Sequence, residues 1–355
     1  MAPDELGRRA PGAERASAVS LLHERSLAIE TQPLAADRLG VHAELRDVRH
    51  VDMPAYLGVS HPAGVVHHMV LDLEIDPELS ILAIDAKMLK APFEPSEKTR
   101  GEGCRHILPS YQRLIGTKLD ASYATRVFET VGGRLGCFHI LSLAQCLPLA
   151  VRAASGRLCA GALEMPRGSA DVVRDSCAEW RVDGPHWTAV RETAGAGFRE
   201  FRREIRITAQ ADENLRLGMT ADLTDRRPGA AEMGAALTFW LEVPRFTILE
   251  AEAKLRGSPF AGCARTVTGA ARFEGLSVTK GFTAAALERI GGAAGCAHLS
   301  ALVIALTPVI PQASGALAGF LKLPPEQKLR NRATNPQVDS CHMWRSDGPL
   351  LKMGN

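Results

Sequence analysis

The segment Asp175–Pro185 reads DSCAEWRVDGP, and the segment Asp339–Pro349 reads DSCHMWRSDGP. The shared pattern D-S-C-x-x-W-R-x-D-G-P is too long to recur by chance. The chain is therefore predicted to be an internal duplication with a long period, and its other motifs are compared in pairs. Asp-Gly-Pro favours a turn, so each copy is expected to be a closing segment at the end of its repeat.

Two pairs of strands follow from this comparison. Leu39–Asp47 aligns with Leu217–Asp225, and Ile81–Lys87 aligns with Ile248–Lys254. The first pair alternates apolar and polar residues, which is typical of half-buried strands. The second pair is also interpreted as strands, so strands are expected in the first part of each repeat.

Helices are predicted in the second part of each repeat. Gly136-Cys137-Phe138-His139-Ile140 matches Gly295-Cys296-Ala297-His298-Leu299, and each opens a long apolar stretch with helical spacing. Strands followed by helices, without strict alternation, favour an α+β fold. We predict two tandem pseudo-symmetric repeats, each an antiparallel sheet followed by helices and related by a pseudo-two-fold axis. The expected boundaries are a disordered segment at 1–19, repeat A at 20–190 and repeat B at 198–351.

Composition narrows the class of protein. A chain of 355 residues is long enough for two domains with their own cores. The net charge of +2 gives no electrostatic reason to expect nucleic acid or anionic lipid as a partner. The polar start lacks the apolar core of a secretory signal, and no uninterrupted apolar run is long enough to span a membrane. The eight cysteines contain no C-x-x-C pair, so we expect a cytoplasmic protein with reduced thiols.

The pattern Pro-Phe…Cys…Leu-x-Gly…Gly-Phe…Gly-Gly-x-x-Gly-Cys-x-His-Leu resembles a bacterial family catalogued as domain of unknown function 2889. Members with one repeat carry G-C-T-H-L at the Gly-Cys-x-His position, and a histidine before a methionine on the third strand. Here His67 or His68 before Met69 matches that histidine, whereas repeat B has Gly234 or Ala235. The resemblance implies proteobacterial catabolism of aromatic compounds and, for a duplicated chain, release of formaldehyde from a phenylcoumaran, a lignin-derived dimer.

The histidines are the first candidates for chemistry. His139 lies two residues after a cysteine at a helix entry, where an imidazole could act as a general base or a metal ligand. The alternative is a helix-start histidine that satisfies backbone groups. His67 and His68 project to opposite faces of one strand, so one of them faces the core or a pocket. A soft metal site of Cys104, Cys137 and His139, completed by His67, is a weaker alternative, since buried cysteine is also common in cores.

Two further residues complete the predicted site. Asp85 could orient a histidine, although an ion pair with Lys87 is the competing interpretation. Tyr111 could hydrogen-bond a phenolate through its hydroxyl, although packing is the competing interpretation. The catalytic prediction is therefore His67, His139, Asp85 and Tyr111, with no metal.

The sequence lacks the motifs of nucleotide, dinucleotide and serine-hydrolase sites, so we expect no cofactor. An enzyme is favoured: a cofactor-independent lyase that cleaves a carbon–carbon bond of a phenolic lignin-derived dimer by a retro-aldol step. The alternatives are a non-catalytic binding or assembly module and a metal-dependent hydrolase. The expected partner is a small aromatic substrate, with no nucleic acid and no membrane; a homodimer is left open.

Overall fold

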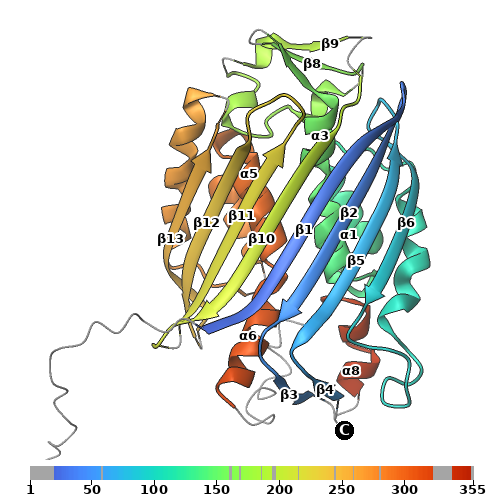
Figure 1. Cartoon of the computed structure of the whole chain (residues 1–355), viewed down its shortest axis with the longest axis vertical. Coiled ribbons are helices and arrows are strands. Elements are labelled where there is room, and N and C mark those ends of the chain that lie inside the picture. Colours follow the sequence, from blue (N-terminus) through green and yellow to red (C-terminus); the bar gives the residue numbers. More distant parts are fainter. Residues whose placement is uncertain are drawn as a thin grey trace, which may run out of the picture.

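A computed structural model describes residues 20–352, with gaps at 57–58, 160–161, 168, 185, 194–196, 215, 244, 259, 280 and 323–337. The predicted disordered segment 1–19 lies outside the described residues. The dominant element is one eight-stranded antiparallel sheet with strand order β13-β12-β11-β10-β1-β2-β5-β6 (Figure 1). Its strands are β1 (Ser20–Ala35), β2 (Arg38–Arg49), β5 (Gly64–Ile75), β6 (Ile81–Lys90), β10 (Phe201–Ala211), β11 (Leu217–Arg226), β12 (Met233–Glu242) and β13 (Thr247–Arg256).

The two repeats join edge to edge, through the antiparallel pairing of β1 with β10. Leu27 pairs with Leu45 of β2, and Ile205 pairs with Leu223 of β11 in the same way. Leu27 and Ile205 are therefore equivalent positions, and they are also each other's partners across the seam. A pseudo-two-fold axis consequently passes through this pair. The predicted α+β fold with two pseudo-symmetric repeats is confirmed.

The helices lie on one face of the sheet (Figure 1). Repeat A contributes α1 (Tyr123–Val131), α2 (Phe138–Gln145) and α3 (Leu147–Ser155), after the 3-10 helix η1 (Cys104–Leu114). Repeat B contributes α4 (Phe282–Ile290), α5 (Ala297–Leu306), α6 (Val309–Phe320) and α8 (Pro349–Lys352), after η6 (Ala261–Phe273). Alternate strand residues point toward these helices and form one continuous core, in which Leu27, Leu45, Ile205 and Leu223 are at most 2% exposed.

Smaller elements lie at the ends of the sheet (Figure 1). They are the hairpin of β3 (Met53–Tyr56) and β4 (Val59–His61), and a small sheet of β7 (Arg157–Cys159), β8 (Ala162–Met165) and β9 (Val190–Glu192).

The opposite face of the sheet carries polar side chains that pair across strands. Arg202 of β10 contacts Glu30 of β1 and also Glu204 on its own strand, and Arg256 of β13 contacts Asp222 of β11 with both terminal nitrogens. Cross-strand pairs of opposite charge are favourable in antiparallel sheets. This face is therefore built for water or for a polar partner rather than for a second apolar layer.

Two helical stretches have the length and composition of a membrane span. One is Phe138–Ser155, with a mean hydropathy of 1.2, and the other is the pair α5 and α6, which meets at Pro308 with a bend of 43°. The first stretch is not an uninterrupted apolar run, because it contains Gln145 and Arg152. Of the Phe138–Ser155 window, 67% is buried inside the structure, because these helices cover the sheet.

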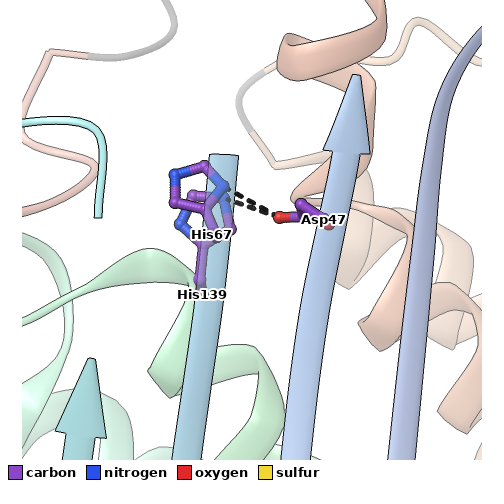
Figure 2. A group of neighbouring side chains, drawn as sticks. All are labelled: Asp47, His67 and His139. Atoms are coloured by element: carbon purple, nitrogen blue, oxygen red, sulfur yellow. Dashed lines mark hydrogen bonds and ion pairs between the residues drawn. The ribbon is translucent and has the colours of Figure 1, made fainter. Parts of the chain in front are cut away.

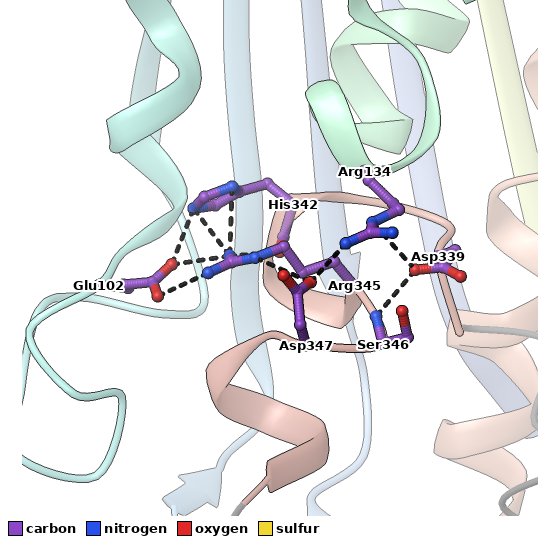
Figure 3. A network of polar contacts seen from close by, with 7 residues as sticks. All are labelled: Glu102, Arg134, Asp339, His342, Arg345, Ser346 and Asp347. Atoms are coloured by element: carbon purple, nitrogen blue, oxygen red, sulfur yellow. Dashed lines mark hydrogen bonds and ion pairs between the residues drawn. The ribbon is translucent and has the colours of Figure 1, made fainter.

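The closing segments are exchanged between the repeats. The Ala178 N–H of repeat A donates a hydrogen bond of 2.8 Å to the Gly295 carbonyl of repeat B, and the His342 N–H of repeat B donates one of 2.8 Å to the Gly136 carbonyl of repeat A. Figure 3 shows the second contact region, in which Arg345 binds the Glu102 carboxylate. Each repeat thus covers the Gly-Cys-x-His turn of the other.

We predict that Leu27→Ala lowers the free energy of unfolding by about 3 kcal/mol, because the change leaves a cavity at the seam that the backbone pairing cannot close. Leu82→Ala is the matched control, since Leu82 is 41% exposed on the edge strand β6. Urea unfolding measures both variants. An equal decrease in the free energy of unfolding of the two variants would contradict the inference that the β1–β10 seam is important for stability.

Candidate functional site

A buried carboxylate anchors the site of repeat A. Asp47 on β2 lies directly opposite Arg25 on β1, and both side chains are 0% exposed. The guanidinium binds both oxygens, with Nε at 2.7 Å from Oδ1 and Nη2 at 2.8 Å from Oδ2. Arg25 also donates from Nη1 to the Ala305 carbonyl of α5, at 3.2 Å. A buried ion pair with this many hydrogen bonds is stable only as a unit, because removing either partner strands a charge.

Three histidines surround this carboxylate. His67 Nδ1 lies 2.9 Å from Asp47 Oδ2, His23 Nε2 lies 3.3 Å from Oδ1, and His139 Nε2 lies 3.7 Å from Oδ2. The imidazoles of His67 and His139 are stacked, with ring centroids 3.8 Å apart and planes inclined by 27°. Figure 2 shows both rings facing Asp47, one from β5 and one from the start of α2.

The Gly-Cys-x-His turn places His139 over the sheet. A Cβ at Gly136 would overlap the Val131 carbonyl oxygen at the end of α1, so only glycine permits this close approach. The Cys137 N–H then donates to the Tyr111 hydroxyl, at 3.1 Å. Tyr111 is fully buried, and it therefore holds the turn that carries His139.

The environment keeps His67 and His139 neutral. Burial lowers the pKa of His139 well below its ordinary value, and the nearby His67 and Arg25 act in the same direction. Burial also lowers the pKa of His67, against the opposing hydrogen bond to Asp47. Burial alone would raise the pKa of Asp47, but Arg25 and the hydrogen bonds of the histidines hold it well below its ordinary value. Asp47 is thus a carboxylate that faces two neutral imidazoles, those of His67 and His139.

Three ring nitrogens of this cluster have no hydrogen-bond partner among the described residues: both of His23 and Nε2 of His139. His139 Nε2 is buried and unpaired, while its Nδ1 lies 3.9 Å from the Cys137 sulfur. The His139 side chain is 11% exposed, compared with 4% for His67 and 0% for Asp47. Of these three side chains, that of His139 is therefore the most exposed, although its Nε2 is buried.

The residues fit a metal ion poorly. Ligand atoms of Asp47, His67 and His139 lie within 4.8 Å of one another, close enough to share an ion. However, Arg25 already binds both Asp47 oxygens, and its charge repels a cation placed there. The stacked rings also lie side by side instead of converging from different directions, as the ligands of a tetrahedral ion do.

Repeat B repeats the ion pair but changes its surroundings. Arg203 Nε lies 2.7 Å from Asp225 Oδ1, and His298 Nε2 lies 3.2 Å from Asp225 Oδ2. The strand register places Met233 opposite Asp225, where repeat A has His67 opposite Asp47. This corrects the sequence alignment, which put Gly234 or Ala235 at that position. Phe201, two residues before Arg203, likewise takes the place of His23.

The structure brings together two of the four predicted residues, His67 and His139, and places Tyr111 behind them. The prediction that Asp85 orients a histidine is wrong. Its side chain is 61% exposed on the polar face of the sheet, where it pairs with Lys87 at 2.9 Å. The orienting carboxylate is Asp47 instead. Sequence analysis missed Asp47, although the sequence holds a usable signal for it. Residues of Leu39–Asp47 alternate between buried and exposed positions, and Asp47 falls at a buried one.

A family model described as protein of unknown function (DUF2889) matches residues 23–152 and 201–312, one segment in each repeat. The matched segments include the buried ion pair and the Gly-Cys-x-His turn of both repeats. No curated protein and no solved structure matches the chain.

The lowered pKa of His139 predicts an acid-sensitive fold. Below pH about 6.5 the unfolded imidazole binds a proton that the folded one does not, so stability falls as the pH is lowered. His139→Gln should reduce the dependence of the free energy of unfolding on pH by up to about 1.4 kcal/mol per pH unit. Urea unfolding between pH 5 and pH 8 measures it.

His298→Gln is the matched control for this series, because the pKa of His298 shifts the other way. Burial acts to lower that pKa, but the hydrogen bonds to Asp225 and Cys296 outweigh burial and raise it. Its stabilising contribution is complete below pH about 6.5 and is lost as the pH rises through the folded pKa. The acid slope should survive in this variant; identical acid slopes in wild type and His139→Gln would refute the assignment.

Proposed function

The chain belongs to the DUF2889 family, and we propose that its repeat A is an acid–base active site with His139 as the general base. The proposed enzyme is a cofactor-independent carbon–carbon lyase that releases formaldehyde from a phenolic, lignin-derived aromatic dimer. The observation that supports acid–base chemistry most strongly is the neutral Nε2 of His139, which is buried beside the Asp47 carboxylate without a hydrogen-bond partner among the described residues.

The surroundings of His139 suit a base that works near neutral pH. A general base must be unprotonated before the reaction and must tolerate the charge that it acquires. Its low pKa meets the first requirement. The Asp47 carboxylate, 3.7 Å from Nε2, meets the second, because it stabilises an imidazolium once the proton has arrived.

The proposed reaction begins when the free phenol of a phenylcoumaran-type dimer gives up its proton and the benzylic C–O bond of the ring ether breaks. The ether oxygen leaves as a phenolate and takes that proton, and the other ring becomes a quinone methide. His139 Nε2 takes the proton of the primary alcohol, and the bond between the hydroxymethyl carbon and the adjacent carbon breaks. The hydroxymethyl group leaves as formaldehyde, and the bonding electron pair moves through the quinone methide to the phenolic oxygen. His139 then returns its proton to the phenolate, so no external oxidant, reductant or cofactor is consumed.

His67, Asp47 and Arg25 act as positioning residues in this proposal. His67 stacks on His139 and is itself held by Asp47 at 2.9 Å, while Arg25 fixes both oxygens of Asp47. A base held within a fraction of an ångström of its productive place gains much of its rate advantage from that placement. Tyr111 contributes by holding the turn before His139, rather than by touching substrate.

The test is formaldehyde release from a hydroxymethyl-bearing phenolic dimer by the purified full chain. His139→Gln should lower kcat at least about 100-fold, the usual cost of losing a general base. His68→Gln is the matched control, because His68 lies on the same strand but on the polar face, paired with Glu44 at 2.5 Å. The acid limb of kcat/KM in the wild type should lie below pH about 6.5, since the pKa of the base is lowered. No formaldehyde from any phenolic dimer would end the lyase proposal.

Two alternatives predict different results. If the protein is a binding or assembly module, the His139 variants should melt at a lower temperature, and the wild type should show no catalytic turnover. A metal-dependent hydrolase is favoured only by the 4.8 Å clustering of Asp47, His67 and His139. Elemental analysis of the purified chain should find no stoichiometric transition metal; one ion per chain that is lost in His67→Gln would favour the hydrolase.

A further inference from the structure

Repeat B contains a small pocket that the proposed lyase site does not use. The pocket has a volume of about 70 Å³ and lies between the sheet, the Gly-Cys-x-His turn of repeat B and the closing segment of repeat A. Cys296 and His298 both line it. Because Cys177 and Glu179 come from repeat A, the pocket exists only through the exchange of closing segments.

A thiol, an imidazole and a carboxylate are arranged in series at this pocket. Cys296 Sγ lies 3.9 Å from His298 Nδ1, and His298 Nε2 lies 3.2 Å from Asp225 Oδ2. Arg203 holds Asp225 from the other side, as a buried ion pair. This order of groups is the one that activates cysteine nucleophiles, because the imidazole takes the thiol proton and the carboxylate stabilises the resulting cation.

The first turn of α5 adds to this activation. Cys296 is the residue before α5, and the backbone N–H groups of His298 and Leu299 act to lower the pKa of its thiol. Burial acts to raise the pKa of Cys296, but the interactions with His298 outweigh it and lower that pKa below its ordinary value. The pKa of His298 is raised in turn. A thiolate next to an imidazolium is the reactive form of such a pair.

Repeat A supplies an internal comparison. Cys137 is also 3.9 Å from its histidine and also precedes a helix, yet burial and the nearby Cys341 raise its pKa to about 12. The pKa values of Cys137 and Cys296 differ because different side chains surround the aspartate next to each histidine. His139 shares the Asp47 carboxylate with His67 and His23, whereas Met233 and Phe201 leave Asp225 to a single histidine.

We propose that Cys296 is the nucleophile of a second site, which adds reversibly to small aldehydes with His298 as the proton donor. The sulfur forms a bond to the carbonyl carbon, and the π electron pair of the carbonyl moves to its oxygen. That oxygen takes the proton from the His298 imidazolium, which gives a neutral hemithioacetal and a neutral imidazole. No leaving group, oxidant or reductant is needed. The proposal is independent of the function of repeat A.

The size of the pocket restricts the ligand to a few heavy atoms, since about 70 Å³ is little more than twice the ~30 Å³ share of one liquid water molecule. Addition to an aldehyde fits that space because the product loses no fragment that would have to leave. The groups that face Cys296 set its pH dependence. They are His298, Asp225, Arg203, Cys177, Glu179, Cys263, Arg152 and Arg256.

The first experiment measures the alkylation of each cysteine by iodoacetamide in the native full chain, using peptide mass spectrometry. At pH 7, Cys296 should react at least tenfold faster than Cys137, its counterpart in repeat A. His298→Gln should slow Cys296 at least tenfold and move the midpoint of its pH–rate profile upward, with the melting temperature measured alongside to show that the variant is folded. Equal rates for Cys296 and Cys137 in the wild type would overturn the proposal without any variant.

The second experiment tests the ligand class. Millimolar acetaldehyde should slow the alkylation of Cys296 at least twofold, and dialysis should restore the original rate, because a hemithioacetal is reversible. Cys296→Ser should show no aldehyde-dependent labelling change at any other cysteine. A fast-reacting Cys296 that acetaldehyde does not protect would overturn the assignment to aldehydes.

Discussion

The pairing of β1 with β10 is the constraint on which the rest of this structure depends. It joins two copies of one ancestral unit into a single sheet, and Leu27 and Ile205 lie on the pseudo-two-fold axis that relates them. Because the sheet is continuous, helices α1 to α6 can cover one face and share one core. The same symmetry brings the end of each repeat across to the other, so that neither Gly-Cys-x-His turn is covered by its own closing segment.

Next to this seam, each repeat buries an arginine and an aspartate on neighbouring strands. The pairs Arg25–Asp47 and Arg203–Asp225 have nearly the same geometry, and each presents a carboxylate to a histidine from the first helical turn above it. A buried charge of this kind is costly to isolate, so the pair fixes the local arrangement of the sheet. The aspartate of each pair also places a negative charge next to the helix histidine. That histidine is neutral in repeat A, and its pKa is raised in repeat B.

The other side chains next to Asp47 and Asp225 determine whether the helix histidine is neutral or protonated. In repeat A, His23 and His67 compete with His139 for Asp47, and burial leaves His139 neutral. In repeat B, Phe201 and Met233 cannot compete, so His298 takes a raised pKa and polarises Cys296. The two repeats therefore surround the same ion pair with different groups, which are neutral imidazoles in repeat A and a thiol–imidazole pair in repeat B.

The sequence by itself determined the duplication, the order of strands before helices, and the Gly-Cys-x-His turns, because these are local signals that recur in matched pairs. It pointed to His67 and His139 but paired them with Asp85, because Ile81–Lys87 does not alternate cleanly between apolar and polar residues and so does not show which face of the sheet Asp85 takes. Only the tertiary structure selected Asp47, put Tyr111 behind the turn and exchanged the closing segments. Those outcomes depend on contacts between residues far apart in the chain, whose partners are chosen by burial and charge in the folded state rather than by neighbouring sequence.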